Sequence, residues 1–320
     1  MKPLRAVAIA LALALAVLLG ASLFADVGKL RAAASDYPWW RLAPAAALVL
    51  GNYALRTVRF RYYLSALGVL VSWSEAALVF TAGFLFTVTP GKMGEVVKGW
   101  LLQRRRGASV TDVASSVVAE RFTDVVGLLA IAAVGVAETG AHRQLFWIVV
   151  ALCLAFLLAV AHPRLVPATL VRLGPALHKL PKGEQIKSTI GRIHAILLQL
   201  CQPKRLLIGV ALAALAWLLE AIAFRVLLDG LGAQAGLGSA IVVYAMATLF
   251  GAVSMLPGGV GSTEAVMVAL LLQPDLGLQL DVPRATLATL LIRFATLWFG
   301  VGMGALCFGP AQRKPLSQQH

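Results

Sequence analysis

The sequence predicts an all-α polytopic membrane protein with about six full transmembrane helices, two re-entrant helical hairpins and an inverted-topology repeat. Hydrophobic residues make up 60% of the 320-residue chain, charged residues only 13%, and the mean hydropathy is +0.85. Several apolar runs are long enough to cross a bilayer. Two of these runs are broken by similar Pro-Gly segments, and such paired breaks in corresponding halves indicate a transporter's binding site.

The apolar runs set the order of the elements. Two interrupted runs are expected to form the hairpins, at 74–103 and 238–272. Residues 1–24 also resemble a signal peptide, but they complete the repeat described below, so we interpret them as a span. The full spans are expected at about 6–24, 43–66, 110–137, 144–161, 206–228 and 285–308.

The net charge of +14 fits the membrane better than a nucleic-acid partner, because the charges collect in particular loops. Most of the 28 Lys and Arg lie on the side that holds the N-terminus, Arg104–Arg106, the linker 162–205 and the tail. By the positive-inside rule both termini are therefore cytoplasmic, and we expect a multi-pass protein of the bacterial inner membrane. The three cysteines are scattered, and the histidines form no metal set, so no cofactor or metal is expected.

The two halves of the chain repeat each other. Arg121-Phe122 matches Arg293-Phe294, and the assigned orientations make the second half inverted in the membrane. Phe60-Arg61 and Leu67-Gly68 match Phe224-Arg225 and Leu231-Gly232 in the same way. We divide the chain into a first half-repeat (1–161, its last span, 144–161, belonging to the second half by symmetry), the linker (162–205), a second half-repeat (206–310) and a tail (311–320).

Each hairpin is predicted to dip into the membrane and return. The second arms, Gly91–Leu102 and Ser262–Leu272, cover roughly 18 and 17 Å, well short of a ~30 Å hydrocarbon core. Tilted full spans are the alternative. The residues expected at the two tips are Pro90, Gly91 and Gly94 in the first hairpin and Pro257, Gly258, Gly259 and Gly261 in the second.

Ionisable residues at membrane depth are the predicted substrate-binding groups, because they are costly there unless paired or hydrated. Glu120, Arg121 and Asp124 lie roughly 15–20 Å into their span. Arg293 occupies the position of Arg121 in the other half, without acidic neighbours. This asymmetry would suit an anionic group held by Arg121 and Arg293, with the acids pairing or relaying protons.

Three further charged residues follow the helix breaks. Glu95 and Glu264 start the second arms, where a carboxylate either caps the helix or contacts substrate or a coupling ion. Lys92 occurs only in the first half, and an ammonium beside a helix N-terminus suits a phosphate. The alternative for Lys92 is a lysine that extends to the interface.

The linker 162–205 is basic and interrupted by prolines. Within it, Ile186–Leu200 has a helical apolar stripe, which predicts an amphipathic helix on the anionic inner leaflet. A solvated loop is the alternative. The chain has no P-loop, Rossmann, nucleophile-elbow or HExxH motif, so we do not expect an enzyme.

Three motifs carry a resemblance to a known family. Thr89-Pro90-Gly91-Lys92-Met93-Gly94-Glu95, Glu120-Arg121-Phe122-Thr123-Asp124 and Leu256-Pro257-Gly258-Gly259-Val260-Gly261-Ser262-Thr263-Glu264 resemble the lysylphosphatidylglycerol synthase transmembrane family of flippase-like proteins, over about residues 5–310. Larger members are linked to a cytoplasmic aminoacyltransferase domain. The chain ends at His320 without one, so we expect a stand-alone member.

The resemblance implies a lipid flippase that works by alternating access. Stand-alone members are thought to move aminoacylated phospholipids, polyprenyl-linked sugars or hopanoids. Two other functions remain open: a secondary transporter of a small hydrophilic solute, and a non-transporting membrane partner of a cytoplasmic lipid-modifying enzyme.

Overall fold

All regular structure in the described part of the chain is helical. A computed structural model describes residues 27–89, 94–140, 162–178, 183–234, 236–254 and 256–313, with residue 12 and scattered positions from 144 to 158. The prediction of an all-α membrane fold is confirmed. In chain order the elements are α2 (Val27–Ser35), η1 (Trp39–Arg41), α3 (Leu42–Ala66), α4 (Trp73–Gly83), η2 (Phe84–Phe86), α5 (Gly94–Arg106), α6 (Val110–Thr139), α8 (Leu165–His178), α9 (Gly183–Leu200), α10 (Pro203–Asp229), α11 (Leu237–Val253), η4 (Pro257–Gly259), α12 (Ser262–Leu271), η5 (Pro274–Leu276), α13 (Val282–Arg293), the π-turn η6 (Phe294–Trp298) and α14 (Phe299–Gln312).

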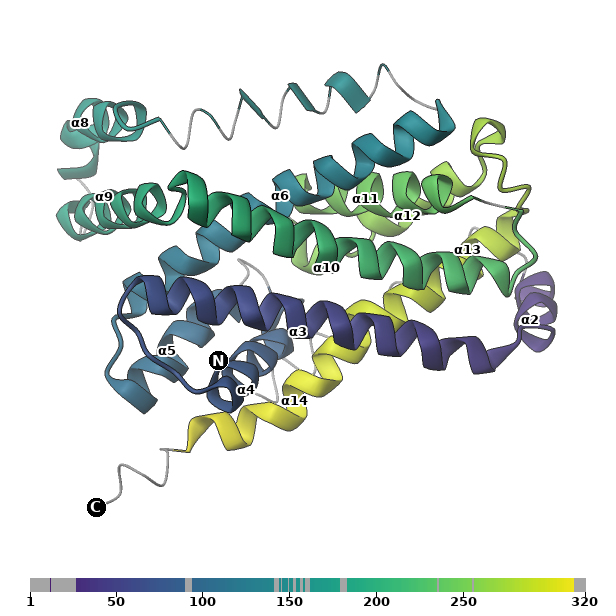
Figure 1. The fold of residues 1–320 in the computed structure, drawn as a ribbon, viewed down its shortest axis with the longest axis horizontal. Coiled ribbons are helices and arrows are strands. Elements are labelled where there is room, and N and C mark those ends of the chain that lie inside the picture. The colour runs from purple at the N-terminus through teal and green to yellow at the C-terminus, as the bar shows by residue number, and fades with distance from the viewer. Residues whose placement is uncertain are drawn as a thin grey trace.

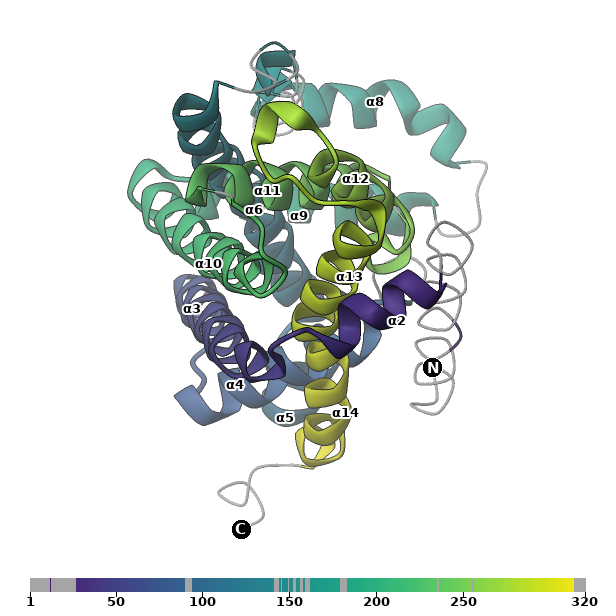
Figure 2. The same ribbon diagram turned by 90° about the vertical axis from the view of Figure 1, so that its right-hand side faces the viewer.

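Four long helical segments form the body of the bundle, and they lie where full spans are expected. They are α3, α6, α10 and the continuous segment α13–η6–α14 (Figure 1). Viewed along the long axis of the bundle, these helices surround a shared interior (Figure 2). The expected span at 6–24 lies outside the described residues except for one position, and that at 144–161 is described only in part.

Within the described residues, two helical segments are long and apolar enough to cross a membrane by composition alone, at 203–229 and 282–312. The helices α3 and α6 are as long, but each carries several charged side chains near its middle. Arg59 of α3 is fully buried and bonds Asp124 of α6, at 2.7 Å. The mean hydropathy of a helix includes such paired internal charges. It therefore underestimates how apolar the outer faces of α3 and α6 are.

Side-chain caps fix where the long helices begin. Ser109 accepts the backbone N–H of Asp112 at the start of α6, and Asp281 accepts that of Arg284 at the start of α13. Both caps satisfy a backbone donor that has no partner within the helix. Gly140 ends α6 in the left-handed conformation, with φ 67°.

The first hairpin consists of α4, η2 and α5, and its two arms run antiparallel. Glu75, at the start of α4, accepts hydrogen bonds from Arg105 and Arg106 at the end of α5, at 3.0 and 2.7 Å. Arg105 also donates to the carbonyl of Ala311 at the end of α14, at 3.2 Å. The open end of this hairpin therefore lies beside the C-terminal end of the bundle.

The second hairpin consists of α11, η4 and α12. Ser239, at the start of α11, donates to the carbonyl of Leu276, which follows α12, at 2.8 Å. At the tip, Gly258, Gly259 and Gly261 have φ values of 62°, 65° and 88°, a region that favours glycine. These residues let the chain reverse between two apolar arms.

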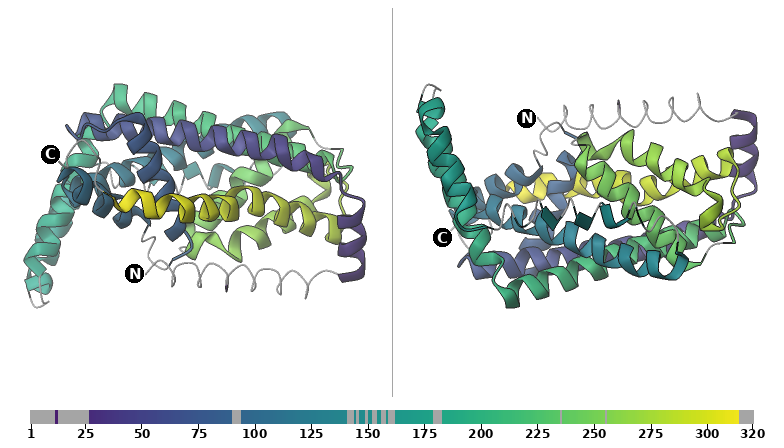
Figure 3. Two further views of the ribbon diagram at one scale, coloured as in Figure 1. Left: turned by 90° about the horizontal axis from the view of Figure 1, so that it is seen from below. Right: turned by 90° about the horizontal axis from the view of Figure 1, so that it is seen from above.

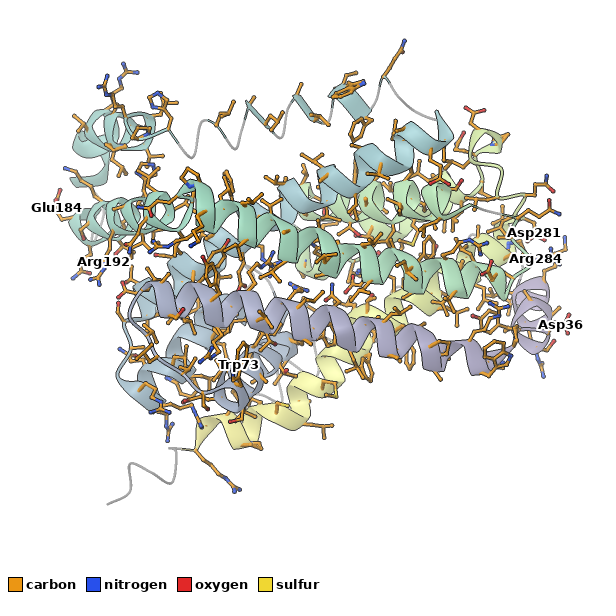
Figure 4. All side chains as sticks on the ribbon, viewed as in Figure 1. Asp36, Trp73, Glu184, Arg192, Asp281 and Arg284 are labelled. Atoms are coloured by element: carbon orange, nitrogen blue, oxygen red, sulfur yellow. The ribbon has the colours of Figure 1, made fainter. Side chains whose placement is uncertain are left out.

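The two hairpins open at opposite ends of the bundle. Figure 4 shows Glu184 and Arg192 at the end that holds α4 and α5, and Asp36, Asp281 and Arg284 at the other end. Between these ends α6 packs tightly on its neighbours. A Cβ atom on Gly127 would lie 2.8 Å from the backbone nitrogen of Ala214 in α10.

The π-turn η6 joins α13 to α14 beside the first hairpin. Its Thr296 carbonyl accepts the Tyr53 hydroxyl at 2.6 Å. Beyond it, Gly304 lies against the backbone of Thr81, Phe84 and Leu85. One continuous helical segment thus contacts both halves of the structure.

The linker forms two helices that lie crosswise to the long axis at one end of the bundle (Figure 3). The predicted stripe of α9 is divided between two environments. His194, Leu197 and Leu200 are buried, while Ile186 and Ile190 are exposed. The C-terminal half of α9 is therefore part of the bundle, and α8 extends from the other half.

Candidate functional site

A cavity of about 220 Å³ lies at mid-height in the bundle, and both hairpins contribute residues to its wall. Arg121 and Arg293 both line it. Each follows the first residue of its helix, Val110 or Val282, by eleven positions, which is roughly 17 Å of helical rise. Because α6 and α13 begin at opposite ends of the bundle, the two arginines reach the same depth from opposite directions.

Two residues of the cavity lining are partly exposed. The side chain of Arg121 is 41% exposed although it lies near the middle of α6. Leu256, another lining residue, is 43% exposed.

Asp124 is the centre of a buried polar network. Its carboxylate accepts hydrogen bonds from Arg59 at 2.7 Å and from the indole N–H of Trp217 at 3.1 Å. Arg121 donates to the other carboxylate oxygen at 3.3 Å. Thr123 accepts a further bond from Arg59 at 3.2 Å. Helices α3, α6 and α10 are thus held together by a charge pair that is almost fully buried.

Glu120 pairs with the first hairpin. Its Oε2 lies 3.6 Å from Nζ of Lys98 in α5, and the two side chains are only 1% and 5% exposed. Lys98 also lies 4.1 Å from the centre of the Phe80 ring, a favourable cation–π geometry. Since Lys98 lines the cavity, this pair couples the cavity wall to α6.

Arg293 holds the tip of the second hairpin. Its Nε donates to Glu264 at 2.6 Å, and its Nη2 donates to the carbonyl of Gly258 at 2.7 Å. Glu264 in turn accepts the backbone N–H of Gly261 at 2.7 Å. The Glu264 carboxylate therefore caps α12, one of the two roles expected for it, and it also binds Arg293.

Two charged residues on the cavity wall have no ion pair among the described residues. Arg56 is 8% exposed, and its guanidinium lies 5.4 to 5.9 Å from the ring centres of Phe80, Phe84 and Trp217. Glu220 is 3% exposed and accepts a hydrogen bond from the Tyr244 hydroxyl. Both line the cavity.

The predicted residues fall into four groups. Arg121, Arg293, Gly258 and Gly259 line the cavity. Glu120, Asp124 and Glu264 lie behind them as ion-pair partners. Pro257 begins η4, Gly261 precedes α12 and Gly94 begins α5. Pro90, Gly91, Lys92 and the side chain of Glu95 lie outside the described residues.

Sequence reasoning missed Arg56, Lys98 and Glu220 as cavity residues. The positive-inside rule counts basic residues by side of the membrane, so it does not separate Arg56 and Lys98 from surface charges. Arg56 lies fourteen residues into α3, or roughly 21 Å by helical rise, so its depth alone would have identified it.

The comparisons with known proteins identify a family. Residues 7–304 match the family described as the lysylphosphatidylglycerol synthase transmembrane region. The chain belongs to this family. The match includes the three motifs and both hairpins.

Two relatives are membrane proteins of Methanothermobacter thermautotrophicus, both named UPF0104 membrane protein. One is 24% identical over 315 residues, which covers 91% of this chain and 90% of the relative. The other is 24% identical over 229 residues, covering 66% and 67% respectively. Membership of the lysylphosphatidylglycerol synthase transmembrane family makes the chain a membrane protein.

Proposed function

We propose that this protein moves the polar headgroup of a membrane lipid across the bilayer by alternating access through the cavity between the hairpin ends. The observation that carries the proposal is a cavity at mid-height that is lined by cations and has two partly exposed lining residues, Arg121 and Leu256. The family is described as the transmembrane region of a lipid synthase, which supports a lipid cargo.

We propose that the cavity opens on the side of the bundle, which would suit a lipid better than a small solute. A lipid can place its headgroup in the cavity while its hydrocarbon chains remain in the bilayer. Leu256 and Arg121 both line the cavity and are partly exposed. An apolar and a charged residue in the exposed part of the lining suit the boundary between chains and headgroup. A secondary transporter of a small hydrophilic solute, the second hypothesis, would instead need a path from the end of the bundle.

The cavity charges favour an anionic group on the cargo. Arg56, Lys98, Arg121 and Arg293 all line the cavity, and Glu220 does so too. Arg293 already donates hydrogen bonds to Glu264 and to the Gly258 carbonyl, and Arg121 donates one to Asp124. Arg56 has no carboxylate partner among the described residues, so an oxyanion would gain most by binding there. Aminoacylated phospholipids and polyprenyl-linked sugar phosphates both supply this group, whereas a hopanoid would need an acidic headgroup.

In the membrane we propose that both hairpins are re-entrant and that the repeat is inverted. The second arms α5 and α12 have 13 and 10 residues, or roughly 20 and 15 Å, so neither could cross a ~30 Å core. The basic end with α8 and α9 would face the cytoplasm, with both termini, in a bacterial inner membrane. No catalytic residue and no cofactor are assigned.

Reconstitution tests the proposal. Vesicles containing the protein and phosphatidylglycerol with a fluorescent acyl chain would be treated with a membrane-impermeant quencher, and the rate at which the inner lipid becomes accessible measured. We expect wild type to exceed protein-free vesicles, and Arg56→Gln and Arg121→Ala to lower the rate at least tenfold. Arg293→Ala should lower it as well, by releasing the hairpin tip.

The matched control is Arg192→Gln, since Arg192 is exposed and pairs with Asp112 away from the cavity. It should leave the rate unchanged. Equal, background rates for wild type and all variants would reject lipid transport. That result would favour the third hypothesis, a non-transporting partner that binds a cytoplasmic lipid-modifying enzyme through the linker.

A further inference from the structure

Arg56 and Glu220 face the same cavity without forming an ion pair. They carry opposite charges, and both side chains are more than nine-tenths buried. In the described residues no carboxylate lies within ion-pair distance of Arg56, and no cation lies within that distance of Glu220. The Nε of Arg56 is buried without a hydrogen-bond acceptor. Such groups are costly to bury, which suggests that each has a ligand in another state.

The other carboxylates at this depth are already neutralised by direct partners. Asp124 bonds Arg59 and Arg121, Glu120 pairs with Lys98, and Glu264 bonds Arg293. A proton added to any of them would break an existing ion pair. Among these described carboxylates, Glu220 alone has a hydroxyl, that of Tyr244, as its partner.

The surroundings of Glu220 come from four packed helices. Helix α3 supplies Arg56 and Tyr53, α6 supplies Asp124, α11 supplies Tyr244 and α13 supplies Arg293. Asp124 and Arg293 are engaged in the bonds described above. Arg121 shares Asp124 with Arg59, but its side chain is 41% exposed, so solvent screens its charge. This leaves Arg56 as the nearby buried cation whose charge is available to balance that of Glu220.

We infer that Glu220 is a proton-binding site and that it takes up a proton when an anionic cargo binds Arg56. The inference rests on the proposed function and adds a coupling ion to it. When the cavity is empty, the positive charge of Arg56 offsets the negative charge of Glu220 across the cavity. An oxyanion on Arg56 removes that compensation, so the ionised carboxylate becomes an unbalanced charge in a low-dielectric site.

Glu220 then takes one proton from a hydronium ion in the surrounding water: an O–H bond of hydronium breaks, an O–H bond to the carboxylate forms, and a water molecule is left. Arg56, the bound anion and the protonated Glu220 together again carry no net charge. The cargo and the proton are bound together, so a monoanionic headgroup and one proton would cross as a neutral pair. A proton gradient would then drive the cargo in the direction of proton flow.

Binding-linked proton uptake tests the inference. Purified protein in a weakly buffered detergent solution with a pH indicator would be titrated with dihexanoyl phosphatidylglycerol, a short-chain anionic probe, near pH 7.5. We expect uptake approaching about one proton per bound probe, and affinity that strengthens by up to about tenfold per unit as the pH falls.

Three variants separate the roles. Glu220→Gln, which resembles the protonated side chain, should bind the probe with no proton uptake and little dependence on pH. Arg56→Gln should lose both binding and uptake. Asp275→Asn is the matched control, because Asp275 is exposed in η5, outside the cavity lining. It should behave as wild type.

Two results would distinguish the inference from the function on which it rests. Saturable binding without proton uptake, or equal uptake in wild type and Glu220→Gln, would overturn proton coupling and leave lipid transport intact. Failure of wild type to bind the probe, together with background transport in vesicles, would reject the proposed function itself.

Discussion

Arg293 donates to Glu264 at 2.6 Å, linking the last membrane segment to the tip of the second hairpin. The same arginine binds the Gly258 carbonyl, and the same carboxylate binds the Gly261 N–H. One ion pair therefore fixes the turn, the start of α12 and the position of α13.

Replacing Glu264 with Gln should destabilise the protein by about 3 kcal/mol, because it leaves Arg293 without its anionic partner in a site where both side chains are nearly buried. The free energy of unfolding would be measured by SDS titration in mixed micelles. The double variant with Arg293→Gln should cost less than the sum of the two single changes, by roughly 0.5–3 kcal/mol. Additive effects would show that the pair does not hold the tip.

Asp124→Asn should cost about 3–5 kcal/mol, because Arg59 is fully buried and would lose its only charged acceptor among the described residues. The matched change is Asp112→Asn, whose partner Arg192 is 58% exposed. We expect that change to cost no more than about 1 kcal/mol. The same titration compares them, and equal costs would contradict the assignment of Asp124 as the centre of the buried network.

Cysteine labelling should reveal the orientation of the hairpins. In a background without native cysteines, Ser74→Cys and Gln103→Cys lie at the exposed open end of the first hairpin, and Asp275→Cys lies just after the second. An impermeant maleimide should label the first two from the cytoplasm and the third from the other side. Labelling of all three from one side would disprove the inverted repeat.

Burial raises the pKa of the Cys201 thiol from 9.0 to about 11, in the turn between α9 and α10. Maleimide attacks the thiolate, so at pH 8 the reaction should be roughly 100-fold slower than for an ordinary thiol. The measurement uses a Cys153→Ser/Cys307→Ser protein between pH 7 and 11, with the SDS-unfolded chain as reference. The folded rate should still rise above pH 9.5, where the reference levels off.

The raised pKa of Cys201 also determines the direction in which the free energy of unfolding changes with pH. Folding favours the neutral thiol, so its contribution is complete below pH 9 and is lost as the pH rises towards about 11. A stability that increased over this range would contradict burial of the thiol.

Local signals in the sequence predicted much of the fold. Pro257 and Gly258 mark the second tip. Proline restricts the backbone dihedral angles and glycine allows additional ones, so a helix break can be recognised from these residues without knowing what packs against them. The caps Ser109 and Asp281 also act locally, at the start of α6 and of α13, but they were not predicted. The caps and breaks lie within a few residues of the elements they define.

The partners of the charged residues could not be predicted in this way. Arg59 and Asp124 are 65 positions apart and meet only because α3 and α6 pack together. Arg56 could not be recognised as a cavity residue by counting charges, since the positive-inside rule does not consider how far a residue lies along its helix. Depth and packing, which need three dimensions, separate a cavity residue from a surface one.

The π-turn at Phe294–Trp298 has a consequence for comparing relatives. A π-turn contains one residue more than a turn of α-helix, so the residues after it are displaced by one position relative to a regular helix. Arg293 on one side and Gly304 on the other contact different halves of the protein. A relative that lacks the extra residue would turn a different face of its last helix towards the first hairpin, so alignments should treat the two sides of Thr296 as separate blocks.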